Sequence, residues 1–261
     1  MNITITHIDT ACISLDINGY RILTDPTLDK AGRVYYHGAG SFSRKTGDPA
    51  VDADHLLPVD LILLSHHQHK DNFDKQGRSF ALKSPLILST KKAQQAIPQI
   101  VGLSDWEQHV IDTPKVPGLR ITAAPAQHHP WWLPEFFSGK VIGFLIEFDG
   151  QTNGAIYISG DTVYFKGIEE VAKRFTVDIG IFHLGSVEFR YLTGFGRYTM
   201  NGKDLSRAAK VIQPKIIIPV HYKGWSHFKE NESKLRRIIA ADELLQRRTL
   251  FLQPGKPVAL R

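Results

Sequence analysis

One junction constrains this sequence more than any other. A strand-like apolar run at residues 59–64 leads directly into residues 65–74, a segment rich in imidazoles and carboxylates. The run carries a single charge, Asp60, which is typical of a strand buried on both faces. Open α/β sheets bind their ligands beyond the carboxyl ends of such strands. The junction therefore predicts a site at the edge of a sheet that contains this run.

The rest of the chain alternates between strand and helix patterns. Asn18-Gly19 predicts a type I′ hairpin, because both central residues of that turn need a positive φ, and residues 149–154 predict a second turn between antiparallel strands. Other strands are expected near residues 85–88, 119–124, 141–148, 155–159, 177–182, 215–220 and 249–252, and helices near 89–97, 167–174, 203–212 and 230–246. This interleaving indicates a mixed α/β layered fold. No repeat or linker divides the sequence, so we expect a single domain over residues 1–261.

The polar segment has the composition of a metal site. It places His66, His67 and His69 close together and adds Asp71 two residues later. The chain has 12 histidines but only 1 cysteine, which excludes a Cys-rich zinc site. Imidazole nitrogen and carboxylate oxygen suit zinc, manganese or iron. We therefore expect one or two divalent metal ions, with zinc the first choice and manganese or iron as alternatives.

Three further apolar runs also end in a potential metal ligand. The run at 119–124 is followed by His128, the run at 155–159 by Asp161, and the run at 215–220 by His221. A single histidine at a strand end is more often a structural residue that hydrogen-bonds within the core. Four such junctions in one chain form a constellation, which predicts that the ligands meet at one sheet edge.

The order of these motifs resembles the metallo-β-lactamase-fold hydrolases. That family carries a His-x-His-x-Asp-His loop, a later His, a Gly-Asp-Thr and a final His after an apolar strand. The motifs are most similar to the branch that includes ascorbate-6-phosphate lactonase and the phospholipase D acting on N-acyl ethanolamine phospholipids: Thr24-Asp25-Pro26, Pro125-Ala126-Gln127-His128, Ser159-Gly160-Asp161-Thr162 and Pro219-Val220-His221. The resemblance covers nearly the whole chain. It implies a four-layer αββα sandwich of the metallo-β-lactamase type and a metal-dependent hydrolase.

The first motif departs from the family pattern, because residues 65–74 are one residue longer than the family loop. If the family motif is aligned from the end of the preceding strand, His66 is the first ligand. If the motif is aligned backward from Asp71, His69 is the second ligand and His67 is the alternative first ligand. We favour His66, His69 and Asp71, because the strand end and the following helix start are better anchors than the loop between them.

The same motif lacks its last histidine, because Asn72 stands at that position. An amide is a poor ligand beside imidazole, so the second metal position is weakened. Three outcomes are open: one metal bound tightly and one loosely, one metal only, or a substitute ligand. His183 and His227 are the candidate substitutes, and each could instead be structural or serve as a proton donor.

The resemblance also implies a role for each candidate ligand. The first metal would take His66, His69 and His128, the second would take Asp71, His221 and the substitute for Asn72, and Asp161 would bridge the two. Bound metal lowers the pKa of its water from about 16 toward about 7, which makes a hydroxide nucleophile available at neutral pH. We therefore expect cleavage of an ester, a lactone or a phosphodiester.

Four side chains are the expected catalytic groups in this scheme. Asp71 or Asp161 would accept a proton during the reaction, and His183 or His227 would donate one to the leaving group.

Aromatic residues are expected to shape the substrate pocket. Residues 26–58 show little periodicity and suggest a lid or binding loop. Trp131, Trp132 and Tyr164 are the expected contacts for a small anionic substrate in a partly apolar pocket. The alternative for the tryptophans is ordinary packing.

Two alternative functions compete with a small-molecule hydrolase. A net charge of +6 would suit a nuclease of the same fold acting on RNA or DNA, but the basic residues are scattered and form no long arm, which disfavours nucleic acid. Asn72 gives weight to a non-catalytic metal-binding module. The sequence contains no signal-peptide or membrane-span pattern, so a cytoplasmic protein is expected. Both a monomer and a homo-oligomer stay open.

Overall fold

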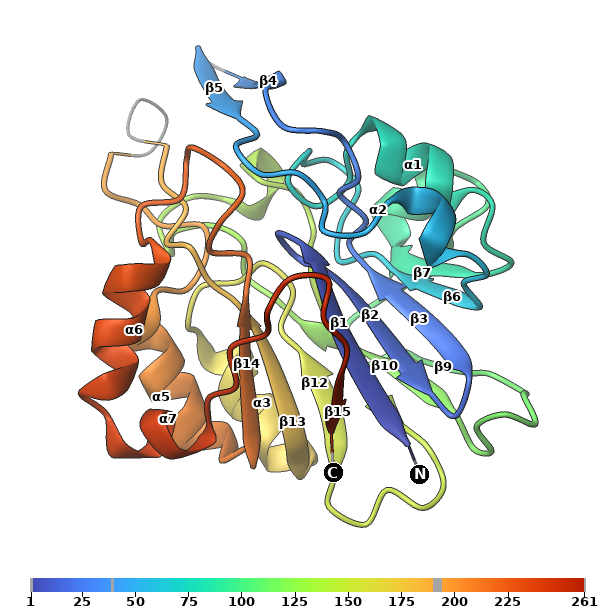
Figure 1. Cartoon of the computed structure of the whole chain (residues 1–261). Coiled ribbons are helices and arrows are strands. Elements are labelled where there is room, and N and C mark those ends of the chain that lie inside the picture. The colour runs from blue at the N-terminus through green and yellow to red at the C-terminus, as the bar shows by residue number, and fades with distance from the viewer. Residues whose placement is uncertain (1, 39, 190–193, 261) are drawn as a thin grey trace.

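Two β-sheets pack face to face, and helices cover the outer face of each sheet (Figure 1). The structure is a computed structural model, which describes residues 2–38, 40–189 and 194–260. Side chains between the sheets form one core, in which Ile5 and Leu15 of one sheet pack with Ile121 and Phe144 of the other. The arrangement confirms the four-layer αββα sandwich that the motifs predicted.

The first sheet combines an antiparallel meander with a parallel half. Its strands run in the order β15 (Val258–Leu260), β1 (Ile3–Asp9), β2 (Cys12–Ile17), β3 (Tyr20–Thr24), β6 (Leu61–Leu63), β7 (Ile87–Thr90) and β8 (Val101–Leu103). Strands β3, β6, β7 and β8 are parallel. The turn between β2 and β3 has φ of 50° at Asn18 and 82° at Gly19, which confirms the predicted hairpin.

The second sheet is antiparallel on one side and parallel on the other. Its strands run in the order β14 (Ile216–Val220), β13 (Val177–His183), β12 (Ala155–Ile158), β11 (Ile142–Glu147), β10 (Arg120–Pro125) and β9 (Gln108–Val110). Strands β12, β13 and β14 are parallel, whereas β9 to β12 alternate in direction. The predicted turn at 149–154 joins β11 to β12.

The helices divide between the two outer faces. Helices α1 (Lys75–Ala81) and α2 (Lys91–Ala96) pack on the first sheet, and α3 (Lys166–Arg174), α5 (Gly202–Ile212), α6 (Glu232–Ala240) and α7 (Glu243–Arg248) pack on the second. Two short 3₁₀ turns, η1 (Ala53–Leu56) and η2 (Glu135–Phe137), lie in loops. No helix in the described ranges is long and apolar enough to cross a membrane.

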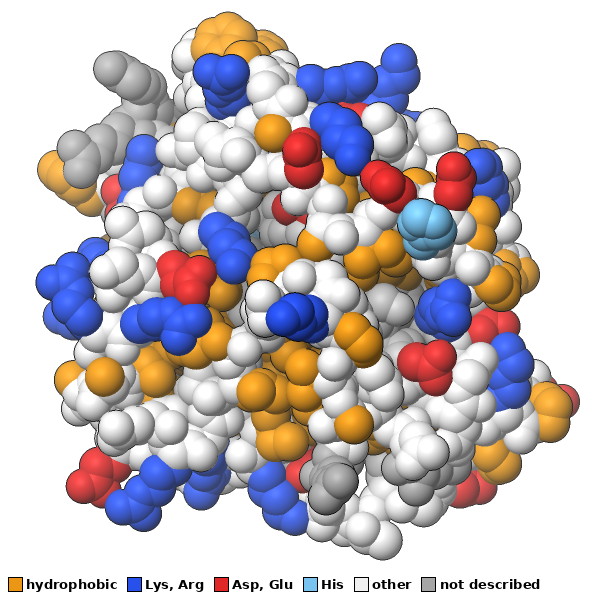
Figure 2. All heavy atoms as spheres, in the orientation of Figure 1, with side chains coloured by type: hydrophobic (Ala, Val, Ile, Leu, Met, Phe, Trp, Pro, Cys, Tyr) orange, Lys and Arg blue, Asp and Glu red, His pale blue; other side chains and the backbone are white. Residues whose placement is uncertain are grey.

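Residues 26–58, expected as an irregular loop, contain a hairpin of β4 (Val34–Gly38) and β5 (Ser41–Arg44). The hairpin projects from the sandwich at the top of Figure 1, and Figure 2 shows hydrophobic side chains at its tip. Val34, Tyr36 and Phe42 are each 62% exposed. Because these side chains bury little surface, the base of the hairpin must hold it in place.

Two sequence expectations near the C-terminal end are wrong. The helix expected over 230–246 is two helices, because Asp242 caps a new one: its carboxylate accepts hydrogen bonds from the N–H groups of Leu244 and Leu245 at 3.1 and 3.3 Å. Residues 249–252 form no strand. They touch β14 through an isolated bridge and one backbone bond, from Leu250 N to Ile217 O at 2.8 Å.

A buried lysine fixes the base of the hairpin. Lys45, directly after β5, is fully buried and forms ion pairs with Asp9 at the end of β1 and with Asp74, whose Oδ2 lies 3.5 Å from Lys45 Nζ. Asp74 also caps α1, because its Oδ1 accepts a hydrogen bond from Gly77 N at 2.7 Å. This one ammonium group thus joins the hairpin, the first strand and the helix that follows the polar segment.

Replacing this lysine should destabilise the fold strongly. Lys45→Ala leaves two buried carboxylates without their cation, and we expect it to lower the free energy of unfolding by about 3–5 kcal/mol. Urea unfolding followed by circular dichroism measures the effect. Lys30→Ala is the matched control, because Lys30 pairs with Asp52 at 3.1 Å on the surface, where both side chains are more than half exposed. The control should unfold nearly like the parent, and equal losses in both variants would contradict this account.

Candidate metal centre

Six strands bring polar side chains to one edge of the sandwich. The ends of β3, β6, β10, β12, β13 and β14 carry or precede Asp25, His66, His128, Asp161, His183 and His221, in that order, and all six side chains are buried. At the end of β14 the chain turns sharply: His221 has a φ of 58°, and its N–H donates to Thr10 O at 2.8 Å. The constellation predicted from the strand ends is therefore brought together.

Three imidazoles form the first group of potential ligands. His69 Nδ1 lies 3.1 Å from His66 Nε2 and also 3.1 Å from His128 Nε2. A single proton on His69 Nδ1 cannot serve both neighbours, whereas three nitrogens at about 2.0–2.1 Å from one tetrahedral metal would stand about 3.3 Å apart. Burial lowers the pKa of all three, that of His69 to about 3, so they are neutral and able to coordinate a cation.

Two carboxylates and one imidazole form the second group. His221 Nε2 lies 3.5 Å from Asp71 Oδ2 and 3.6 Å from Asp161 Oδ2. Burial alone would lower the pKa of His221, but the charges of Asp161 and Asp71 raise it to about 9. Burial would raise the pKa of both carboxyls, yet the neighbouring histidines hold both below their usual range. This group attracts positive charge, which a divalent cation would supply.

Hydrogen bonds to the backbone and to neighbouring side chains orient the imidazoles. Ser65 Oγ lies 2.9 Å from His66 Nδ1, and the serine is itself fixed by Asp25, whose Oδ1 accepts from Ser65 N and Oγ at 2.8 Å each. His128 Nδ1 lies 2.9 Å from Tyr198 O. With one ring nitrogen engaged in this way, the other faces the cluster, as in metal-binding histidines generally.

The residues present fit one or two divalent ions. Several buried atoms around the two groups lack a hydrogen-bond partner among the described residues, including Asp25 Oδ2, Asp161 Oδ2, His183 Nε2 and His221 Nε2. Leaving such an atom unpaired costs about 1–3 kcal/mol, a cost that coordination of a cation would remove for the atoms it reaches. Imidazole and carboxylate donors suit zinc, manganese and iron alike, so the donor set does not select among them.

His67 is the sequence candidate that the structure places elsewhere. It belongs to neither group and lines an outer groove instead, where burial and the charges of Arg78, Lys70 and Lys92 lower its pKa. Its side chain turns outward because Ser65 anchors His66 inward. The alignment of the motif from the strand end, which favoured His66, agrees with this geometry.

His183 and His227 lie beside the second group without joining it. His183 Nδ1 is 2.9 Å from Asp161 Oδ1, and His227 Nε2 is 2.9 Å from Asp71 Oδ2. Each therefore supports a carboxylate of the group. Asn72 is fully buried, and neither atom of its amide has a hydrogen-bond partner.

The pocket above the two groups has aromatic walls, as expected from the sequence, but Trp131, Trp132 and Tyr164 are not among them. It is lined by His37 of the hairpin, Phe137, Ser138, Val187, Phe189 and Tyr198, with His69, Asp71 and His128 also in its wall. Of the expected contacts, Trp131 is 85% exposed and packs edge-on against Trp132, and neither lines this pocket. Tyr164 lies elsewhere, under the guanidinium of Arg207. Aromatic composition alone could not indicate which rings face the site.

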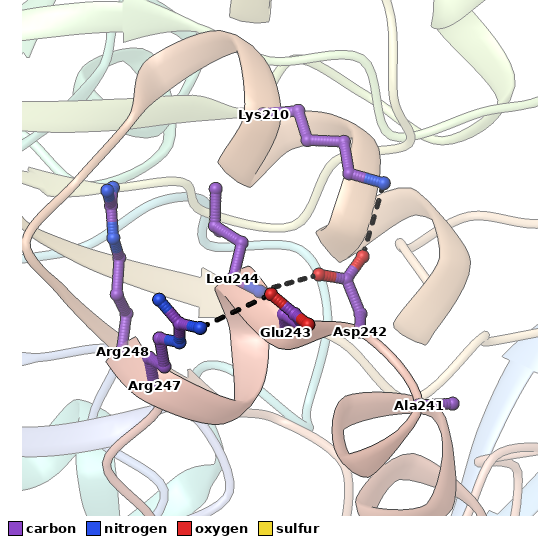
Figure 3. Close-up of a pocket in the computed structure, with 7 residues that line it drawn as sticks. All are labelled: Lys210, Ala241, Asp242, Glu243, Leu244, Arg247 and Arg248. Atoms are coloured by element: carbon purple, nitrogen blue, oxygen red, sulfur yellow. Dashed lines mark hydrogen bonds and ion pairs between the residues drawn. The ribbon is translucent and has the colours of Figure 1, made fainter.

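A second hollow, of about 550 Å³, lies away from these ligands beside α5, α6 and α7 (Figure 3). Its charged side chains pair among themselves or with neighbouring groups: Lys210 with Asp242 at 3.2 Å and Arg247 with Glu243 at 3.3 Å. The lining carries three basic and two acidic side chains, and neither group of potential metal ligands found in the described part of the chain lies in it.

The chain belongs to the metallo-β-lactamase superfamily. A family model described as a β-lactamase superfamily domain matches residues 4–221. A UPF0173 metal-dependent hydrolase of Pelotomaculum thermopropionicum is 25% identical over 220 residues, which cover 82% of this chain and 89% of that protein. The protein is accordingly a metal-dependent hydrolase.

Solved structures share the fold over the full length. The isothiocyanate hydrolase from Delia radicum gut bacteria superposes with a TM-score of 0.80 at 23% identity and covers 98% of this chain and 99% of its own. A possible metal-dependent hydrolase from Veillonella parvula gives a TM-score of 0.81 at 20% identity, with 100% of both chains covered.

Metal analysis of two neighbouring histidine variants should separate a ligand from its neighbour. His66→Ala removes one of the three converging nitrogens, and we expect metal affinity to fall by more than the roughly 10–100-fold that a change outside the ligand shell costs. His67→Ala is the matched control and should retain the metal content of the parent. Mass spectrometry of the bound metals gives the readout, and thermal unfolding tests whether the variants fold. Loss of metal from His67→Ala with retention in His66→Ala would reverse the assignment.

Proposed function

We propose that this hydrolase cleaves an ester, lactone or phosphodiester bond in a small anionic substrate. One observation carries the proposal: two adjacent groups of buried or half-buried ligands, with His69, Asp71 and His128 in the wall of a small pocket that adjoins a larger groove. Metal ions held by these groups would lower the pKa of a water molecule and polarise the bond to be cleaved. Zinc is our first choice for the metal, with manganese or iron as alternatives.

The ligand roles follow the two groups. His66, His69 and His128 would hold one ion, Asp71 and His221 would hold a second, and Asp161 would lie between them. The proposal has Asp71 or Asp161 accept a proton while the nucleophile forms. The neighbouring histidines hold the pKa of both carboxyls below their usual range, so both would be ionised and able to coordinate a metal ion.

The two candidate proton donors are both buried but differ in their contacts with the pocket walls. His183 is fully buried behind Asp161, so we assign it the positioning of that carboxylate. His227 contacts the rings of His37 and Phe189, both of which line the pocket. We therefore assign proton donation to the leaving group to His227, which also hydrogen-bonds to Asp71.

Replacing the central carboxylate should abolish hydrolysis. Asp161→Ala should lower kcat by about 100-fold or more on bis-4-nitrophenyl phosphate, 4-nitrophenyl acetate or a simple lactone, whichever the parent cleaves. Asp112→Ala, which removes an exposed carboxylate far along the chain, is the control and should keep full activity. A chelator should remove the activity, and adding back zinc, manganese or iron singly identifies the metal.

Two experimental results would favour the alternative functions. Metal-loaded protein that cleaves none of these substrates would favour a non-catalytic metal-binding module. RNA binding that weakens steeply with added salt would favour a nuclease.

A further inference from the structure

A long groove leads from the surface to the metal centre. It has a volume of about 590 Å³ and shares His37, His69, Phe137 and Ser138 with the pocket above the two ligand groups. The two cavities therefore adjoin each other, and His69 lines both. A molecule in the groove would reach the metal centre with one end.

The polar segment and the loop opposite it are tied together to form this groove. Gln68 Nε2 donates to Ser138 O at 3.0 Å and to Lys140 O at 3.3 Å. Gly139 lies between these two carbonyls with a φ of 79°, and a Cβ there would stand 2.7 Å from Gln68 Nε2. The positive φ favours a glycine at this position, and the two hydrogen bonds from Gln68 hold the two walls together.

One wall carries positive charge that is not neutralised by the protein. Lys70 and Lys92 line the groove, and neither forms an ion pair with a carboxylate in the described part of the chain. Lys140 also lines it but pairs with Asp105 at 3.0 Å and Glu135 at 3.7 Å, so the one acidic residue of the lining is already engaged.

His67 completes this basic wall. Its side chain lines the groove and not the metal cluster, and its Nδ1 is a buried atom with no hydrogen-bond partner in the described ranges. Lys70, Lys92 and Arg78 lie close enough for their charges to act on its ring. An unpaired buried nitrogen costs free energy, and a ligand that hydrogen-bonds to it would remove that cost.

The other wall is apolar. Tyr36 of the hairpin, Phe136 and Phe137 line the same groove and are 62%, 80% and 64% exposed. Rings left this open to water gain by covering an apolar part of a ligand. The groove therefore offers two chemically different walls along one path to the metal centre.

We propose that the groove binds an amphiphilic anion, whose carboxylate or phosphate group is held by Lys70, Lys92 and His67 while its hydrocarbon part lies on Phe136 and Phe137. The metal centre would act on a bond at the inner end of this molecule, and that last step rests on the proposed function. The substrate would then be a monoester, lactone or diester that carries a separate anionic group next to an alkyl or aryl chain.

Binding of two matched ligands to the metal-loaded protein tests the groove without requiring any hydrolysis. 4-Phenylbutyrate carries the anion, and 4-phenylbutanamide has the same shape without the charge. Calorimetric titration should give a dissociation constant about tenfold lower for the anion, as expected for two partly exposed ion pairs acting together. In Lys70→Ala/Lys92→Ala the ratio of the two constants should fall to about one.

Two further variants serve as controls. Lys173→Ala/Lys203→Ala removes the same charge from exposed positions on α3 and α5 and should keep the tenfold ratio. Phe137→Ala should weaken both ligands equally and leave the ratio unchanged. Thermal unfolding shows whether each variant is folded.

The outcomes distinguish this inference from the proposed function. A ratio near one in the parent, or a ratio that persists in Lys70→Ala/Lys92→Ala, would overturn the groove assignment, the second because the anion would then be held at the metal centre. Failure to hydrolyse any ester, with the expected ratios intact, would overturn the proposed reaction and leave the binding groove standing.

Discussion

The structure depends on how negative charge is balanced at one edge of the sandwich. Asp71 and Asp161 are buried and both lie within 3.6 Å of His221. Two ionised carboxylates this close together inside a protein require positive charge between them, because desolvation opposes each charge and repulsion adds to the cost. The six converging strand ends, the turn at His221 and the serine held by Asp25 all place groups where a cation would supply that charge.

The sequence predicted most of this edge because each ligand is a local feature. A ligand that directly follows an apolar strand is placed by that strand, so His128, Asp161 and His221 could be assigned from short motifs. The choice between His66 and His67 was harder, because adjacent side chains point in different directions according to contacts made elsewhere. Here the decisive contact joins Ser65 to Asp25, 40 positions earlier in the chain. The assignment of these residues as metal ligands stays a prediction until metal is measured.

The failures have different physical origins. Trp131 and Trp132 have the composition of a substrate pocket, but the loop that carries them is fixed by Gln68, which bonds to residues about 70 positions away. That pairing directs Phe136 and Phe137 into the groove in their place. The β4–β5 hairpin was missed because half of its side chains point to water, and the helix expected over 230–246 was interrupted by a cap that periodicity does not reveal. Long-range pairing decided the first case, whereas the hairpin and the cap at Asp242 are local features.

The exposed hairpin has a consequence for how this scaffold can diversify. Its base is bonded to the segment that carries His227, from Thr46 N to Gly224 O at 2.8 Å and from Ser226 N to Arg44 O at 3.0 Å. Its tip, by contrast, contributes almost nothing to the core, so mutations there carry little risk of unfolding the protein. Variation at Tyr36 and Phe42 can therefore be tolerated, and changes at Tyr36, which lines the groove, would alter which molecules bind there. Related proteins of this fold could thus acquire different substrates without any change in the residues of the metal centre.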